Sequence, residues 1–251
     1  MSDVRYLYNG TADGMFCCLY ECLAARRIPA EILPQPQADL SFYEEIYVPT
    51  DPARAEKMRT AIRQRISPYT LRLAEEGFLC ACEGKERLIL DFVRLGLHFG
   101  ARVTGLAGNP VVDRLQKAVQ ALHREAHQYL GFVRFSEYDR ALCAEIEPKN
   151  QVLGLIAPHF CARYPQETLM IFDRTHRQLL VCARGQVRIL PVERFDWQPA
   201  DAEETRYRAL WKLFYDTVAI PERENPRCRL SHMPKRYWNH LTEQQEQTRP
   251  A

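Results

Sequence analysis

The stretch QLLVCARGQVRIL, residues 178–190, decides the fold class. Its two halves are rich in residues that favour β-strands, and the dipeptide Arg184-Gly185 between them is typical of a tight hairpin turn. A two-residue turn joins strands that run in opposite directions. The stretch therefore predicts an antiparallel pair, Gln178–Ala183 with Gln186–Leu190.

Further strands and helices are predicted on both sides of this hairpin. Leu142, Ala144 and Ile146 alternate with Cys143, Glu145 and Glu147, as in a half-buried strand. The predicted strands are Gly131–Tyr138, Ala141–Glu147 and Thr168–Asp173, and the predicted helices cover 111–129, 150–163 and 202–218. Strands joined by short turns, with helices clustered before and after them, favour an α+β fold over a doubly wound sheet.

The N-terminal half is predicted to be mostly helical and to open with a short strand, Val4–Tyr8. Asp13 is expected to cap a helix over 15–27, and three prolines then predict an irregular connection. Asp51 is expected to cap a helix that begins at Pro52, followed by helices over 69–82 and 86–99. The glycine-rich segment 100–110 predicts a boundary between a mostly helical region, 1–100, and an α+β domain, 110–251.

Composition and hydropathy argue against a secreted or membrane-spanning protein. The chain is 46% hydrophobic and 26% charged, with a net charge of only +2, so a nucleic-acid surface must come from local clustering of charge. The first ten residues lack the apolar core of a signal peptide, and no apolar run spans a bilayer. A cytoplasmic location without membrane contact is expected.

The nine cysteines are expected to stay reduced and to pack as small apolar side chains. Cys18 and Cys22 have the first spacing of a radical-SAM cluster motif, but Ala25 stands at the third position. His123 and His127 lie one helical turn apart without the rest of a zinc-protease pattern. No metal site and no cofactor is therefore predicted.

Several polar residues are candidates for acid–base chemistry, although each also has a structural interpretation. Glu125 is expected to face solvent, Arg134 to pair with Glu137 or Asp173, and Asp173 to begin a solvated turn. His159 lies in apolar surroundings beside Phe160. The full set of catalytic candidates is His123, Glu125, Arg134, Glu137, His159 and Asp173.

The segment from Pro221 to His240 carries five Lys or Arg side chains against two carboxylates. Cations that neutralise phosphates, next to aromatic faces that stack on bases, are suited to unpaired nucleic acid. The predicted nucleic-acid-binding residues are Arg223, Asn225, Arg227, Lys235, Arg236, Tyr237 and Trp238. The structural alternative is a C-terminal helix docked through Tyr237, Trp238 and Leu241, with its basic residues solvated.

Five phrases of the sequence carry a resemblance to a known family. They are NGTADG (9–14), HRE (123–125) with GFVRF (131–135), APHF (157–160), RENPR (223–227) and HMPKRYW (232–238). They resemble a bacterial family associated with DNA metabolism and DNA repair. The resemblance implies a companion radical-SAM DNA modification or repair protein, and a similar domain occurs fused to uracil-DNA-glycosylase-family domains. Asn9 departs from the acidic residue expected at that position.

Three functions remain open at this point. The first is a DNA-binding accessory protein that presents damaged or unpaired DNA to a partner enzyme of the radical-SAM or glycosylase type. The second is an enzyme of the lyase, glycosylase or nuclease type that acts on nucleic acid directly. The third is a protein-interaction scaffold without DNA contact, docked through the arginine-rich face from Arg54 to Arg65.

Overall fold

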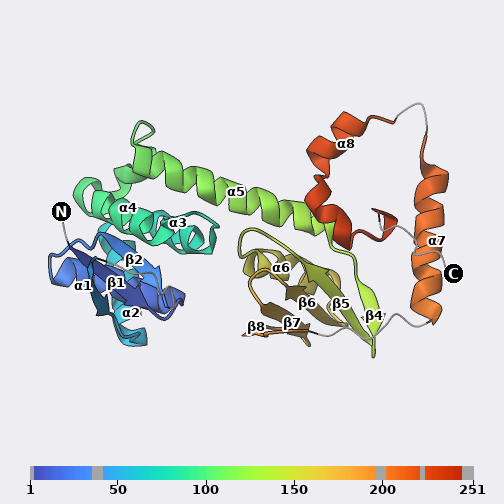
Figure 1. Cartoon of the computed structure of the whole chain (residues 1–251), viewed down its shortest axis with the longest axis horizontal. Helices are drawn as coiled ribbons and strands as arrows, with labels where there is room; N and C mark the ends of the chain where they lie inside the picture. Colours follow the sequence, from blue (N-terminus) through green and yellow to red (C-terminus); the bar gives the residue numbers. More distant parts are fainter. Residues whose placement is uncertain (1–2, 36–41, 196–201, 221–223, 245–251) are drawn as a thin grey trace. The chain divides into compact units, whose positions relative to one another are not determined.

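The computed structural model describes residues 3–35, 42–195, 202–220 and 224–244 (Figure 1). The chain forms two compact units, Met1–Leu122 and His123–Ala251. The division falls inside the long helix α5, Pro110–Phe132. The segment expected to be a boundary lies within the first unit, where part of it forms the 3-10 helix η1, Gly100–Gly105.

A three-stranded parallel sheet lies in the N-terminal unit, in the order β2-β1-β3. The predicted strand β1, Val4–Tyr8, is confirmed and is buried along its whole length. The partner strands β2, Glu31–Pro34, and β3, Glu44–Tyr47, were not predicted, and β2 replaces the expected irregular connection. Arg5 of the central strand pairs with a glutamate on each side, Glu31 at 2.7 Å and Glu45 at 3.4 Å.

The predicted helices of this unit are confirmed, with one correction to their caps. They are α1 (Ala12–Ala24), α2 (Pro52–Arg65), α3 (Pro68–Leu79) and α4 (Lys85–Phe99). Asp51 caps α2 as predicted, accepting from two backbone N–H groups. Asp13 does not cap α1; Thr11 accepts from the Gly14 N–H, because Thr11 is the residue whose extended backbone precedes the first turn.

The C-terminal unit contains a five-stranded sheet in the order β4-β5-β6-β7-β8. Only the β5–β6 pair is parallel, and α6 connects these two strands (Figure 1). The strands are β4 (Ser136–Tyr138), β5 (Ala141–Ile146), β6 (Thr168–Asp173), β7 (Gln178–Ala183) and β8 (Gln186–Pro191). The helices are α6 (Leu153–Arg163), α7 (Ala202–Val218), α8 (Pro226–His232), η3 (Lys235–His240) and η4 (Thr242–Gln244).

This arrangement confirms the α+β fold, with helices concentrated in the N-terminal half and a mostly antiparallel sheet with flanking helices in the C-terminal half. The predicted β7–β8 hairpin is confirmed, and both of its turn residues have positive φ, 50° at Arg184 and 75° at Gly185. The predicted strand Gly131–Tyr138 is wrong over its first half. The hydrogen bond from the Val133 N–H to the Tyr129 carbonyl shows that the helical backbone continues there.

Cysteine burial is confirmed for Cys17, Cys18 and Cys22 in α1, and burial raises the pKa of the Cys22 thiol to about 12. The expectation that all nine cysteines are reduced is wrong for one pair, because Cys161 of α6 and Cys182 of β7 form a disulfide. Packing of α6 on the sheet brings these two positions together, which spacing in the sequence does not reveal. Within the described ranges, no helix has the length and apolarity needed to cross a membrane.

The hairpin turn gives a direct test of the fold. Gly185→Ala forces a side chain into the left-handed region and should lower the free energy of unfolding by about 1–2 kcal/mol. Urea unfolding measures the change. Gly154→Ala is the matched control, because Gly154 lies in α6 with open space around its Cβ position, and it should be neutral or stabilising by up to about 1 kcal/mol. Equal effects of the two substitutions would contradict the turn geometry.

Candidate functional site

A buried carboxylate, Glu125, lies on the helix α5 where it faces the rest of the C-terminal unit. Its side chain is only 2% exposed, so the expectation that it faces solvent is wrong. Glu125 accepts hydrogen bonds from the Lys149 N–H at 3.1 Å and from the Asn150 N–H at 2.8 Å. The Asn150 side-chain amide donates a third at 2.6 Å. The spacing of three residues from buried Leu122 places Glu125 on the buried face.

Two of the predicted nucleic-acid-binding residues complete this buried network. Arg236 lies 3.1 Å from Glu125 and stacks over the Tyr237 ring at 4.6 Å. Tyr237 is buried against Tyr129 and donates a hydrogen bond to Gln128 at 2.6 Å. Arg236 and Tyr237 therefore hold η3 against α5. For these two residues and for buried Leu241, the structural alternative of a docked C-terminal helix describes the contacts.

The other members of the predicted set have varied positions. Arg227 and Lys235 are exposed. Asn225 caps α8 by accepting from the Cys228 N–H, so its side-chain oxygen is engaged within the helix end. Trp238 is partly buried, donates to the Met233 carbonyl and has Arg229 and Lys235 near its ring. Arg223 lies outside the described residues.

Arg134 belongs to a different network. It pairs with Glu243 of η4 through two hydrogen bonds of 2.6 and 3.2 Å, instead of with Glu137 or Asp173. Trp211 of α7 donates a third hydrogen bond to the same carboxylate at 3.0 Å. Burial acts to raise the pKa of Glu243, but the hydrogen bonds from Arg134 and Trp211 outweigh it and hold the pKa below its ordinary value. These contacts fix η4 against α7.

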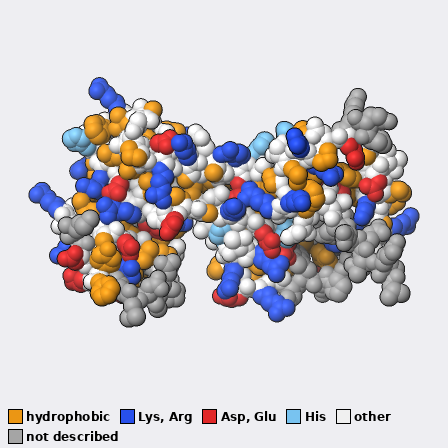
Figure 2. Space-filling view, turned by 45° about the horizontal axis from the view of Figure 1, so that its top comes forward, with side chains coloured by type: hydrophobic (Ala, Val, Ile, Leu, Met, Phe, Trp, Pro, Cys, Tyr) orange, Lys and Arg blue, Asp and Glu red, His pale blue; other side chains and the backbone are white. Residues whose placement is uncertain are grey.

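An open groove of 880 Å³, which we call the α7 groove, lies beside this network. Its lining combines three arginines and five aromatic side chains with one carboxylate. The lining residues are Gly131, Arg134, Phe135, Arg163, Tyr164, Glu204, Tyr207, Arg208, Leu210, Trp211, Phe214 and Thr242. Tyr207 is 60% exposed and Phe214 is 56% exposed. Figure 2 shows basic and hydrophobic side chains next to one another over the C-terminal unit.

The remaining catalytic candidates have different surroundings. Asp173 is fully buried, so the expectation of a solvated turn is wrong for this residue. Its carboxylate lies 2.6 Å from His176 Nδ1 and also accepts from the His176 N–H, which orients the imidazole. His123, Glu137 and His159 are exposed.

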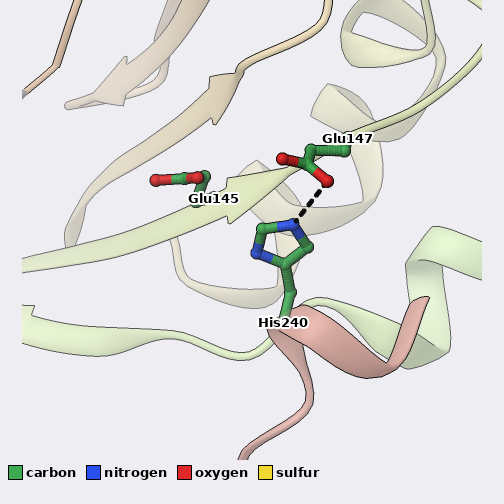
Figure 3. Close-up of side chains that lie close together, drawn as sticks. All are labelled: Glu145, Glu147 and His240. Carbon is green, nitrogen blue, oxygen red and sulfur yellow. Dashed lines mark ion pairs between the residues drawn. The ribbon is translucent and has the colours of Figure 1, made fainter. Parts of the chain in front are cut away.

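A second pocket, of 420 Å³, contains a cluster that was not predicted. Glu145 lies in β5, Glu147 directly follows β5, and His240 is the last residue of η3 (Figure 3). The i, i+2 spacing of the glutamates already places them on one face of a strand. The approach of His240 had no signal in the sequence, because it depends on how η3 docks.

Residues 83–243 match a family described as a domain of unknown function, DUF4130. The match covers more than half of the chain, so the chain belongs to the DUF4130 family. The matched range includes the Glu125 network, the α7 groove and the Glu145–Glu147–His240 cluster. No curated protein matches the chain.

Truncation of Glu125 tests the buried network. Glu125→Ala leaves Arg236 and the Asn150 donors without their acceptor and should lower the free energy of unfolding by about 3 kcal/mol, measured by urea denaturation. Glu137→Ala removes an exposed carboxylate from the same unit and should change it by no more than about 0.5 kcal/mol. A loss below about 1 kcal/mol for Glu125→Ala would contradict the assigned role.

The lowered pKa of Glu243 predicts a pH-dependent contribution to stability. A carboxyl whose pKa is lower in the folded state stabilises the fold above its unfolded pKa, and this contribution is lost as the pH falls through the folded pKa. Glu243→Gln should therefore cost about 2 kcal/mol near neutral pH, and the difference from wild type should shrink towards pH 3. Urea unfolding across this range measures it; a difference that grows in acid would contradict the prediction.

Proposed function

We propose that this DUF4130 protein is a DNA-binding accessory protein of bacterial DNA repair or modification. It presents unpaired or damaged DNA to a partner enzyme of the radical-SAM or glycosylase type. The observation that carries the proposal is the α7 groove, in which exposed aromatic faces lie among arginines. The partner and the repair context rest on the resemblance of the sequence phrases.

The chemistry of the groove fits an unpaired strand better than a duplex. Aromatic faces such as Tyr207 and Phe214 stack on bases only where the bases are not paired to a second strand. Arg163 is exposed and can neutralise a phosphate, whereas Arg208 is held by Glu204 at 2.7 Å and by Ser136. α7 has no buried residue, so its aromatic side chains are accessible along the helix.

Only some of the predicted residues of the C-terminal segment remain available to add to this surface. Arg227 and Lys235 remain available for phosphate contact, whereas Arg236 is engaged by Glu125 and Tyr237 is buried. We therefore assign base stacking to the aromatic residues of α7 instead of Tyr237 and Trp238. Arg227 and Lys235 stay as supporting phosphate contacts.

One observation favours the alternative of an enzyme that acts on nucleic acid. The fully buried Asp173 orients the His176 imidazole, as a carboxylate does beside a general base. Turnover of uracil-containing or abasic DNA by the isolated protein, lost in His176→Ala with the fold intact, would support it. No turnover across such a panel would count against the enzyme alternative.

The scaffold alternative has less support. Arg54 and Arg59, on the arginine-rich face of α2, form ion pairs inside their own unit, Arg54 with Glu21 and Arg59 with Asp13. Co-purification with a radical-SAM protein in the absence of DNA, lost on removal of charge from this face, would favour it.

Binding to single-stranded and duplex DNA, followed by fluorescence anisotropy across a salt series, tests the proposal. Tyr207→Ala and Phe214→Ala should each weaken single-strand binding by about 1–3 kcal/mol because one stacking face is lost. Arg163→Ala should weaken binding to all sequences and reduce the salt slope by about one.

Two controls distinguish the groove from general effects on α7 or on charge. Leu213→Ala removes an exposed apolar side chain of the same helix that does not line the groove, and Lys117→Ala removes an exposed cation of the N-terminal unit. Both should bind as wild type does. Unchanged affinity in the three groove variants, or no binding at low salt, would overturn the proposal.

A further inference from the structure

Glu145, Glu147 and His240 lie close together although they come from two segments far apart in the sequence, and Figure 3 shows the His240 ring facing the Glu147 carboxylate with Glu145 beside them. One ligand atom from each residue lies within 4.8 Å of the others. Three mutually equidistant oxygen or nitrogen ligands about 2.1 Å from one ion are at most about 3.6 Å apart. An inward movement of each atom by up to about 0.7 Å therefore brings the three atoms around one cation.

An independent observation on His240 marks its imidazole as a candidate metal ligand. Its Nε2 atom is inaccessible to solvent and has no hydrogen-bond partner within the described structure. It lies 3.6 Å from Glu147 Oε2, which is too long for a hydrogen bond. Buried polar atoms in folded proteins are almost always satisfied, and a bound ion is one way in which such an atom is satisfied.

The charge balance of the cluster is consistent with an exchangeable cation. Arg174 Nη1 lies 3.4 Å from Glu145 and 3.3 Å from Glu147, and its side chain is 64% exposed. It neutralises the two carboxylates from the solvent side with long, weak contacts. Arg134 and Arg208 also line the pocket, but Glu243 and Glu204 hold them. Arg174 is thus the cation that a metal ion would displace.

We propose that Glu145, Glu147 and His240 form a binding site for a divalent transition-metal ion of the Mn²⁺ class. Two carboxylates favour a hard cation, and the imidazole favours a transition metal over Mg²⁺ or Ca²⁺, which take oxygen ligands. Three protein ligands leave coordination positions open to water or to a ligand that enters the pocket. The proposal goes beyond the proposed function and does not require DNA binding.

The test is titration of the chelator-treated full-length protein with MnCl₂ in the absence of DNA, followed by the electron paramagnetic resonance of free Mn²⁺. Mn²⁺ is the probe because thiolates, such as that of exposed Cys228, prefer softer metals. The wild type should bind one ion per chain. His240→Ala and Glu147→Gln should each weaken binding by about tenfold or more.

Arg174→Ala should change the affinity for Mn²⁺ in the opposite direction. Removal of the competing cation should tighten Mn²⁺ binding, and a folding defect cannot produce such a gain. Matched controls are Glu193→Gln, which removes an exposed carboxylate, and His159→Ala, which removes an exposed imidazole; both should bind as wild type does. Absence of Mn²⁺ binding by the wild type, or affinity unchanged in His240→Ala and Glu147→Gln, would overturn the site.

Discussion

The C-terminal unit depends on how one buried charge is compensated. Glu125 lies on the buried face of α5, where an uncompensated carboxylate would cost several kcal/mol. The loop after β5 supplies backbone and side-chain donors through Lys149 and Asn150, and η3 supplies Arg236. One side chain therefore connects the helix, the sheet and the C-terminal segment, three parts of the unit that are distant in the sequence.

The docking of η3 has consequences for the residues that follow it. With Tyr237 and Leu241 buried, His240 comes to lie beside Glu147, and Glu243 reaches Arg134 and Trp211. The α7 groove and the Glu145–Glu147–His240 cluster are both built on these positions. The two pockets share Arg134, Arg208 and Thr242, so the surface proposed for nucleic acid and the proposed metal site lie side by side in the DUF4130 region.

Local patterns in the sequence predicted the parts of the fold that depend on local interactions. The long helices and the β7–β8 hairpin follow from periodicity and from one turn dipeptide. The strands β2 and β3 did not follow, because each has four residues and is stabilised by pairing with β1. The contacts of the candidate site residues followed least from the sequence. Arg134 pairs with Glu243, which is 109 residues away, and Arg236, from the basic–aromatic segment, pairs with the buried Glu125.

The central claim is that unpaired DNA lies in the α7 groove, and photo-crosslinking tests it most directly. A single-stranded oligonucleotide that carries 5-iodouracil is irradiated with the full-length protein, and the crosslinked peptides are identified by mass spectrometry. Halogenated bases react with aromatic side chains that stack on them, so the crosslinks should fall on Tyr164, Tyr207, Trp211 or Phe214. Crosslinks confined to the N-terminal unit or to Trp238, with none on these four residues, would contradict the account.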